Sequence, residues 1–257
     1  MPDLNVRPTN PDYYQRLSVP VAAMRKAFAD RVSTGLHHHR RHQLIYAVGG
    51  TMRIRIAEMA WFVPPSRALF MPAELQHNVT AFGDVDMCTL YVEPDSYKAA
   101  PPSPLVITVS PLLRELIVAL LGEPPTYECT ARAGKIADLI LDEIARGQRI
   151  DLSIPMPRDS RLLRVCNTVL EDPISDRSFE SLADEAGASA RTLARLFQRE
   201  LKMGFAAWRQ QVRFRVALGA IASGEPIGSI ARNCGYQSAS AFSAAFKRVF
   251  GVPPSQM

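Results

Sequence analysis

The stretch IGSIARNCGYQSASAFSAAFKRVFGVPPSQ (227–256) has the pattern of two short helices joined by a tight turn. Ala231 stands four residues before Gly235, so a small side chain can lie where the two helices meet. Glycine in the turn allows the positive φ that the backbone adopts after the first helix. The stretch therefore predicts a helix-turn-helix unit. The inward-facing positions of its second helix are predicted to be Phe242, Phe246 and Val249.

The same spacing occurs 48 residues earlier, in SFESLADEAGASARTLARLFQRELKMGF (178–205). Ala183 again precedes Gly187 by four residues, and Ser189 is placed to cap a second helix. Between the two units, residues 205–223 are predicted to form one continuous helix. Its length of about 28 Å is near the roughly 34 Å turn of B-DNA. One rigid helix would thus hold both second helices over successive major grooves.

Basic charge is concentrated in the same part of the chain. The protein has 257 residues and a formal charge of +5, and residues 1–157 contain 16 Lys or Arg against 16 Asp or Glu. Residues 158–257 contain 14 against 9, and from Gly187 onward ten basic residues face only Glu200 and Glu225. A basic segment joined to a neutral one favours a polyanion as the partner of the basic segment, although a solvated basic face has the same composition.

The two stretches resemble the AraC/XylS family of bacterial transcription regulators. The second is close to the family signature G-[FY]-x-S-x-S-x-F-x-x-x-F-[KR]-x-x-F-G-x-x-P, and the resemblance covers about the last hundred residues. It implies a ligand-responsive regulator that binds duplex DNA and a small-molecule effector, contacts RNA polymerase, and acts as a homodimer in the cytoplasm.

In this family the exposed face of the first recognition helix enters the major groove, which by position implies Arg191, Ala194 and Arg195. Gln198 shares that face. Arginine suits base reading because its fork donates two hydrogen bonds to guanine. The alternative is that both arginines contact only phosphate or solvent.

The second recognition helix presents smaller side chains. Ala244 stands where many family members have arginine, which leaves Ser240, Ser243 and Lys247 on the outward face. We therefore expect the first unit to read the sequence and the second to position the protein through phosphates.

The first third of the chain is predicted to be β-structure. In TMRIRI (51–56) apolar and basic residues alternate, as in a strand with one exposed face. Gly49-Gly50 and Phe82-Gly83-Asp84 are predicted to be turns between strands. Many short strands with close turns favour a small barrel or sandwich. The other predicted strands are 43–48, 61–63, 68–71 and 88–92.

After Pro101–Pro104 the periodicity becomes helical, over 111–121 and over 131–146. These helices are expected to cover the barrel, to form a dimer interface, or both. The fold class predicted for the whole chain is α+β: a small N-terminal β-barrel, cupin-like, with flanking helices, and an all-α C-terminal domain with two helix-turn-helix units. The predicted boundaries are 1–104 for the ligand-sensing barrel, 105–148 for a helical coupling and dimerisation segment, 149–159 for a linker, and 160–257 for the DNA-binding domain.

All five histidines lie in the predicted barrel. His37, His39 and Gln43 have equal parity, so on one strand their side chains share a face. His77 would arrive from another strand. Converging neutral imidazoles can bind a first-row divalent metal and leave coordination positions open for a ligand. The expected solvated flank consists of His38, Arg40 and Arg41.

The histidine segment also resembles the two cupin motifs, G-x(5)-H-x-H-x(3,4)-E and P-x-G-x-x-H, and many AraC-type regulators have a cupin-like sensor domain. Gln43 stands where a cupin enzyme has a glutamate ligand, and Glu74 replaces the glycine of the second motif. An amide is a weaker metal ligand than a carboxylate. His42 would substitute for it if the strand is bulged. A polar pocket without metal remains the second interpretation.

Two function classes follow from these patterns. The first is the ligand-responsive regulator, and the second is a cupin-type metalloenzyme with a basic tail. Gln43 in place of the glutamate argues against the enzyme, and the sequence has no nucleophile and base pair, phosphate loop or cofactor signature.

Other patterns bear on location. No apolar run reaches the roughly 18 residues of a membrane-spanning helix. The start of the chain, MPDLNVRPTNPDYY (1–14), lacks the basic and apolar segments of a signal peptide. The four cysteines form no C-x-x-C pair, so neither disulfides nor a thiolate zinc site are expected.

Overall fold

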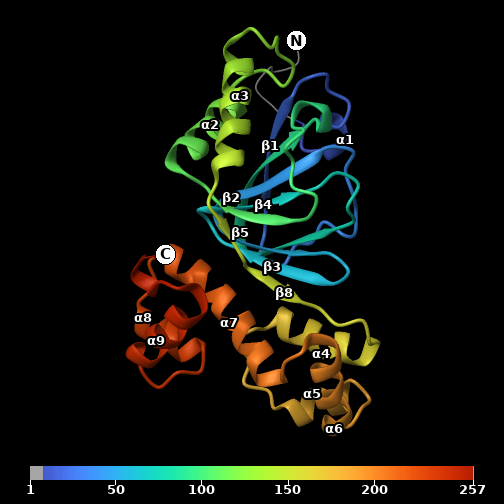
Figure 1. Ribbon diagram of the computed structural model, residues 1–257, viewed down its shortest axis with the longest axis vertical. Coiled ribbons are helices and arrows are strands. Elements are labelled where there is room, and N and C mark those ends of the chain that lie inside the picture. The colour runs from blue at the N-terminus through green and yellow to red at the C-terminus, as the bar shows by residue number, and fades with distance from the viewer. Residues whose placement is uncertain (1–7, 257) are drawn as a thin grey trace. The chain divides into compact units, whose positions relative to one another are not determined.

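The computed structural model describes residues 8–256, which form two compact units (Figure 1). The boundary falls between Leu152 and Ser153, and Ala57–Phe62 belongs to the second unit. None of the described helices has the length and apolar character to cross a bilayer. The elements of the first unit are α1 (Pro11–Tyr14), β1 (Val21–Phe28), β2 (His42–Arg55), β4 (Arg67–Met71), β5 (Asn78–Val92), a 3₁₀ helix (Pro94–Ser96), β6 (Leu105–Thr108), α2 (Pro111–Gly122), α3 (Arg132–Arg146) and β7 (Arg149–Ile150).

The first unit is built on an antiparallel sheet with the order β1-β5-β2-β4-β6-β7. Its centre is the pairing of the two long strands β2 and β5, in which Leu44 is opposite Leu90 and Tyr46 is opposite Cys88. The side chains of this register form one continuous buried surface on the face covered by helices.

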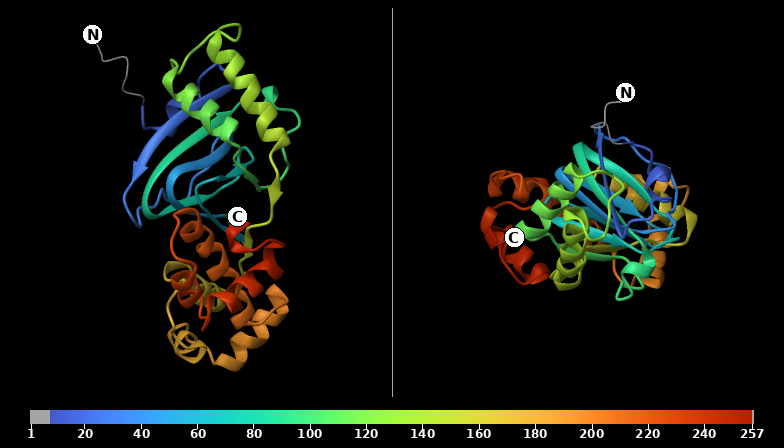
Figure 2. Two further views of the ribbon diagram at one scale, coloured as in Figure 1. Left: turned by 90° about the vertical axis from the view of Figure 1, so that its left-hand side faces the viewer. Right: turned by 90° about the horizontal axis from the view of Figure 1, so that it is seen from above.

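The β-rich first unit and the helical second unit confirm the predicted fold class, but the expected closed barrel is wrong. The hydrogen-bonded path of the described strands ends at β1 and β7, which do not pair with each other. Helices cover the apolar face instead: Leu113 and Ile117 of α2 and Ile140 of α3 are buried in one core with Leu44 and Phe70 (Figure 2). Because α2 and α3 exclude water from this face, the sheet does not have to close on itself.

The turns expected at Gly49-Gly50 and Phe82-Gly83-Asp84 are also wrong, because both segments lie inside long strands. The register between β2 and β5 shifts on either side of Gly49. A bulge of this kind bends a strand without ending it. The runs 43–48 and 51–56 are therefore parts of one strand.

The segments around the helices contain more strand than expected. Leu105–Thr108, at the start of the predicted helical segment, is β6 and pairs with β4. The predicted linker 149–159 contains β7, which pairs with β6, and β8, which pairs with β3. Short strands of two to four residues have too little periodicity to be recognised from sequence.

The second unit has an aromatic core arranged along α7, its longest helix. Trp208 of α7 is fully buried beside Phe197, and its indole N–H donates a hydrogen bond of 2.8 Å to the carbonyl of Pro155. Farther along α7, Phe214 packs against Phe242 and Phe246. The elements of this unit are β3 (Met59–Val63, except its last residue), β8 (Ser153–Pro155), α4 (Ser160–Glu171), α5 (Phe179–Glu185), α6 (Ala190–Leu196), a π-helical turn (Phe197–Leu201), α7 (Phe205–Ala222), α8 (Ile227–Asn233), α9 (Ala239–Phe250) and a 3₁₀ helix (Pro254–Gln256).

Candidate functional site

The predicted turn between α5 and α6 is present. Gly187 has φ +69°, and its N–H donates to the carbonyl of Asp184 at 3.0 Å. Ala183 is fully buried where the helices meet. Ser189 caps α6 by accepting a hydrogen bond from the N–H of Thr192 at 3.2 Å.

The turn between α8 and α9 repeats these features. Gly235 has φ +83°, and its N–H donates to the carbonyl of Arg232 at 2.8 Å. Ala231 is buried. Ser238 caps α9 by accepting from the N–H of Ala241 at 3.2 Å. Both predicted helix-turn-helix units are confirmed.

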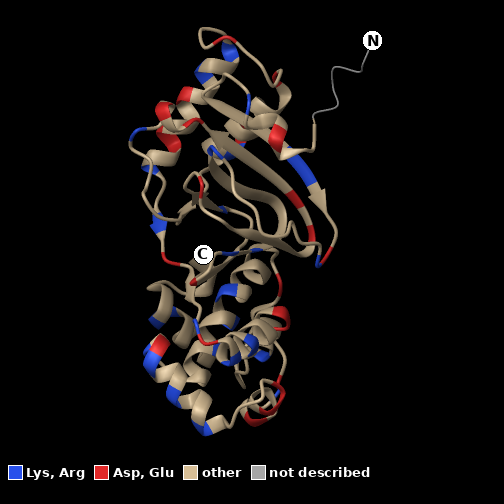
Figure 3. Ribbon diagram, turned by 90° about the vertical axis from the view of Figure 1, so that its right-hand side faces the viewer, with Lys and Arg blue, Asp and Glu red and all other residues tan. Residues whose placement is uncertain are grey.

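The exposed face of α6 carries the predicted basic side chains. Leu193 and Leu196 are buried, whereas Arg191, Ala194 and Arg195 are exposed. Within residues 8–256, neither arginine forms an ion pair with a carboxylate, so both guanidinium groups are available. Figure 3 shows the Lys and Arg residues of the helices in this unit. Gln198 is also exposed, in the wider helical turn that continues α6.

The exposed face of α9 is made of smaller side chains, as expected. Ser240, Ala244 and Lys247 are exposed, and Ser243 is half-buried. Lys247 therefore supplies the only charge among these four residues.

One predicted inward position of α9 is wrong. Phe242 and Phe246 are buried, but Val249 is 46% exposed. At this end of the helix the Phe250 ring lies 4.5 Å from the Phe246 ring and covers the core in its place.

Arg213 of α7 is a structural residue that the sequence patterns do not indicate. It is 7% exposed, and its guanidinium donates to the carbonyls of Pro173 and Ser175 at 3.1 and 2.9 Å and to Asp176 at 3.1 Å. The segment after α4 is thereby fixed to the helix that joins the two helix-turn-helix units.

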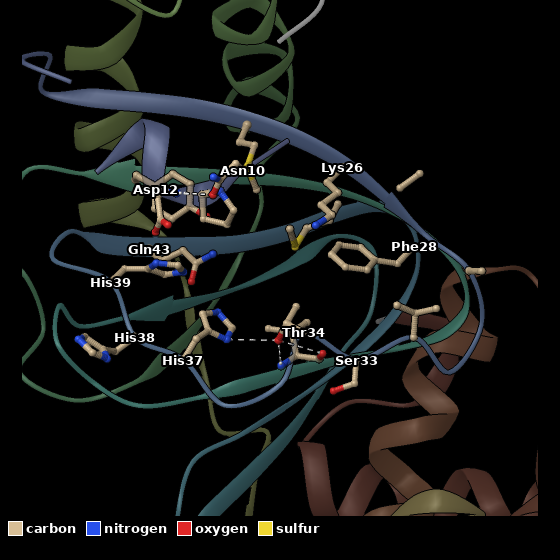
Figure 4. A pocket seen from close by; sticks show the side chains of 18 residues that line it. Asn10, Asp12, Lys26, Phe28, Ser33, Thr34, His37, His38, His39 and Gln43 are labelled. Carbon is tan, nitrogen blue, oxygen red and sulfur yellow. Dashed lines mark hydrogen bonds between the residues drawn. The ribbon is translucent and has the colours of Figure 1, made fainter. Parts of the chain in front are cut away.

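The first unit contains a cavity of about 570 Å³ on the other side of its sheet from α2 and α3 (Figure 4). His37, His39 and Gln43 line it, together with Lys26 and Phe28 of β1. No strand was predicted over 21–28. The segment VAAMRKAF has no regular alternation of apolar and polar residues, because Lys26 shares a face with Met24 and Phe28, so its sequence carries only a weak strand signal.

Three of the predicted ligand residues converge here from different segments. The ring nitrogens that His37, His39 and His77 offer lie within 4.8 Å of one another. His37 and His77 form an isolated β-bridge and His39 lies in the segment before β2, so the expectation of a single strand for His37, His39 and Gln43 is wrong. The bridge brings the side chains together all the same.

Hydrogen bonds fix the orientation of two of these imidazoles. His37 Nδ1 lies 2.9 Å from the carbonyl of Gly35, and His77 Nδ1 lies 2.9 Å from the carbonyl of Leu75. A carbonyl only accepts, so the contact with Gly35 places the proton of His37 on Nδ1 and leaves the lone pair on Nε2. Within the part of the chain that the structure describes, His39 Nε2 is buried without a hydrogen-bond partner.

Burial keeps the inner histidines neutral. Desolvation, together with neighbouring His37 and His77, lowers the pKa of His39 to about 3. Desolvation also lowers the pKa of His77 to about 4, against the opposing effect of its bond to Leu75. Near neutral pH both rings are therefore available as acceptors or metal ligands.

Gln43 lies at the back of this cluster and is 3% exposed. The hydroxyl of Thr89 donates to the carbonyl of Leu44 at 3.1 Å, so it accepts from the amide nitrogen of Gln43 at 3.0 Å. This relay turns Gln43 Oε1 toward His77 Nε2, 3.0 Å away.

Two neighbouring residues differ from expectation. His42 does not join the cluster, because its Nδ1 accepts from the N–H of Ala73 at 2.9 Å. Arg41 is 2% exposed and is not part of a solvated flank. Its guanidinium donates to the carbonyl of Val19 and pairs with Glu93 at 2.8 Å, which compensates its burial.

Comparisons with known proteins match both units. Residues 24–147 match the model of the AraC-like ligand binding domain, and residues 182–257 match a helix-turn-helix domain. The HTH-type transcriptional regulator NimR of Escherichia coli is 27% identical over 253 residues, which are 98% of this chain and 92% of that protein. The arabinose operon regulatory protein of Escherichia coli is 28% identical over 116 residues, or 44% and 39% of the two chains.

A structure of apo ToxT from Vibrio cholerae aligns with 93% of this chain and 97% of that protein at 12% sequence identity, with a TM-score of 0.39. The match to NimR extends over both units, and the two family models fall one on each. This chain, with its N-terminal ligand-binding domain and its two helix-turn-helix units, belongs to the AraC family of transcription regulators.

Proposed function

We propose that this regulator reads its operator through α6 and is anchored on the DNA backbone through α9. The observation that carries the proposal is the contrast between two exposed faces on similar scaffolds. The face of α6 presents the unpaired guanidinium groups of Arg191 and Arg195, whereas that of α9 presents small side chains and Lys247. A guanidinium can donate a pair of hydrogen bonds to guanine O6 and N7, but an ammonium acts as a point charge.

The position of Arg191 supports a contact with DNA. It lies in the first turn of α6, two residues after the cap Ser189. The positive end of the helix dipole disfavours a cation at this place. Helix stability therefore does not account for Arg191, but attraction to phosphate or a base edge does. Ala194 and Gln198 complete the face that would contact bases.

The effector is proposed to bind in the cavity lined by His37, His39 and Gln43. The cavity lies within the segment that matches the ligand-binding domain. A volume of about 570 Å³ is of the size of small-molecule sites, and polar side chains line the cavity together with apolar ones such as Met24 and Val79. His77 would hold the inner end of the site through its contact with Gln43.

Assembly as a homodimer is proposed through α2 and α3. Leu112 and Val118 of α2 and Leu139 of α3 are 52%, 45% and 49% exposed, although each helix already buries another face in the core. Contact with RNA polymerase and a cytoplasmic location are proposed with the family role, since a bacterial regulator meets DNA and polymerase there.

We further propose that the protein is a regulator and not an enzyme. The inner side chains of the cavity are neutral imidazoles and an amide. Asp12 is the one carboxylate among the described lining residues. The neutral donor set is better suited to binding than to acid–base chemistry.

Selection of binding sites from random duplex DNA by the full-length protein tests the DNA-binding proposal. We expect an enriched motif with two parts about one helical turn apart, bound roughly 10³-fold or more tightly than unselected DNA. Affinity should fall as salt rises, because bound Lys and Arg release counterions. Failure to enrich any motif, with or without cell extract as a source of effector, would overturn the proposal.

A further inference from the structure

At the inner end of the cavity both ring nitrogens of His77 face an oxygen that only accepts hydrogen bonds. His77 Nδ1 lies 2.9 Å from the carbonyl of Leu75 and His77 Nε2 lies 3.0 Å from Gln43 Oε1, but a neutral imidazole carries only one proton for these two acceptors. The relay through Thr89 and Leu44 holds the amide in this orientation. One of the two contacts therefore lacks a proton, and a metal ion bound by both His77 Nε2 and Gln43 Oε1 would remove the repulsion between their lone pairs.

The same place collects two more ring nitrogens. His37 donates from Nδ1 to Gly35 and leaves Nε2 free. His39, 6% exposed, has an Nε2 atom with no partner in the described chain. An unsatisfied polar atom in a buried position costs free energy unless something absent from the protein itself satisfies it.

The spacing of these groups fits a metal ion. With metal–nitrogen bonds of about 2.0–2.1 Å, adjacent ligand atoms lie about 3 Å apart. The distance from Gln43 Oε1 to His77 Nε2 has this value, and the ligand atoms of the three imidazoles lie within 4.8 Å of one another. Contact of Nδ1 with a backbone carbonyl, seen for His37 and His77, is the usual outer-shell support of a metal-binding histidine.

We propose that His37, His39, His77 and Gln43 bind a first-row divalent transition metal ion whose remaining coordination positions accept an anionic group of the effector. Three imidazoles and an amide are neutral, so the bound ion keeps its full charge of about +2. His37, His39 and Gln43 line the cavity, and the open positions therefore face it. The effector part of this proposal rests on the proposed function, whereas metal binding does not.

Charges elsewhere in the cavity also favour an anion. Lys26 of β1 lines the same space, and its ammonium lies 5.1 Å from the centre of the Phe28 ring. No carboxylate of the described chain forms an ion pair with it. Lys26 thus adds a second positive charge to the cavity and favours an anionic effector.

Titration of the tag-free, chelator-stripped full-length protein with Co²⁺ and Zn²⁺ tests the metal site. We expect one ion per chain and visible Co²⁺ absorption bands typical of nitrogen and oxygen ligands. His77→Ala and the less buried His37→Ala should each weaken binding at least about 100-fold. His38→Ala is the matched control, because His38 is 53% exposed beside Glu74 outside the cluster, and it should leave binding unchanged.

The variant Gln43→Glu tests whether the side chain at position 43 binds the metal ion or only lines a polar pocket. A carboxylate ligand should tighten Co²⁺ binding about tenfold or more and change its absorption bands. If wild-type protein binds no ion in a 1:1 ratio, or if His38→Ala weakens binding as much as His37→Ala does, the metal site is disproved. An unchanged affinity in Gln43→Glu would exclude Gln43 as a ligand and overturn the proposed ligand set.

Azide added to the Co²⁺ protein tests the open positions. A saturable change in the absorption bands is expected, and Lys26→Met should weaken azide binding several-fold while Co²⁺ binding stays the same. If the Co²⁺ absorption bands do not respond to azide, the ion has no open coordination position, and the proposal that the effector binds to the ion is overturned. DNA selection with the same preparations tests the proposed function independently, since His37→Ala should still enrich the wild-type motif.

Discussion

The turn after α5 and the turn after α8 have the same backbone hydrogen bonds, a buried alanine at the helix contact, and a serine cap at 3.2 Å. The helices that follow differ on their exposed faces, where Arg191 and Arg195 of α6 correspond to small side chains on α9. The comparison shows that the repeated scaffold depends on buried residues and turn glycines. Recognition depends on a few exposed positions that the scaffold does not constrain.

Removal of Arg213, which ties the segment after α4 to α7, should have the largest effect. Arg213→Ala leaves the carbonyls of Pro173 and Ser175 without their charged donor. We expect a loss of about 3 kcal/mol in the free energy of unfolding, measured by denaturant titration of the full-length protein. Arg199→Ala, at a 67% exposed side chain, is the control and should change stability little. Equal losses in the two variants would contradict the role given to Arg213.

The second effect concerns DNA binding and compares one residue from each helix-turn-helix unit. Arg195→Ala should weaken binding to the selected site by about 1–3 kcal/mol and relax the preference at one base pair, because a paired hydrogen bond to guanine is lost. Lys247→Ala should weaken binding to all sequences by a similar factor and lower the salt slope by about one ion. Site selection with both variants distinguishes them. A changed motif in Lys247→Ala with an intact motif in Arg195→Ala would reverse the two roles.

A third comparison uses the turn glycines. Both are in the left-handed region, so alanine at either position should cost about 1–2 kcal/mol of stability. At Gly187 the added Cβ meets nothing within 4 Å, but at Gly235 it lies 2.9 Å from Arg213 Nη1. Gly235→Ala should therefore lower the midpoint of denaturation more than Gly187→Ala. The reverse order would mean that the Arg213 side chain yields more easily than its hydrogen bonds indicate.

The smallest effect is expected at the caps. Ser189→Ala and Ser238→Ala each remove one hydrogen bond of 3.2 Å to a helix N-terminus, and each should cost about 1 kcal/mol. The two losses should agree in chemical denaturation of the two variants. A clear inequality would show that the resemblance between the two turns does not extend to their energetics.

The helix-turn-helix units could be predicted from the sequence because their determinants are local. The alanine and glycine of each turn, the serine cap and the apolar face of the next helix lie within one short stretch. Arg195 could likewise be placed on the exposed face of α6 from the helical period alone. Arg213 could not, because its partners near Ser175 lie 38 residues away in the chain.

The cavity was predicted only in part, because its walls come from distant segments. The histidines form a visible cluster in the sequence. Lys26 lines the same cavity only because β1 pairs with β5. Such a long-range register is not encoded in any single stretch. Gly49-Gly50 shows the other limit: glycine favours both a turn and a bulge, and only the continued pairing of β2 with β5 selects the bulge.

The exposure of the α6 face has an evolutionary consequence. Arg191, Ala194, Arg195 and Gln198 are exposed and contribute little to the buried core, so exchanging them should change the preferred operator at a small cost in folding stability. A duplicated gene can therefore acquire a new set of target promoters through a few substitutions on α6. Its response to the original effector would be inherited unchanged with the N-terminal ligand-binding domain.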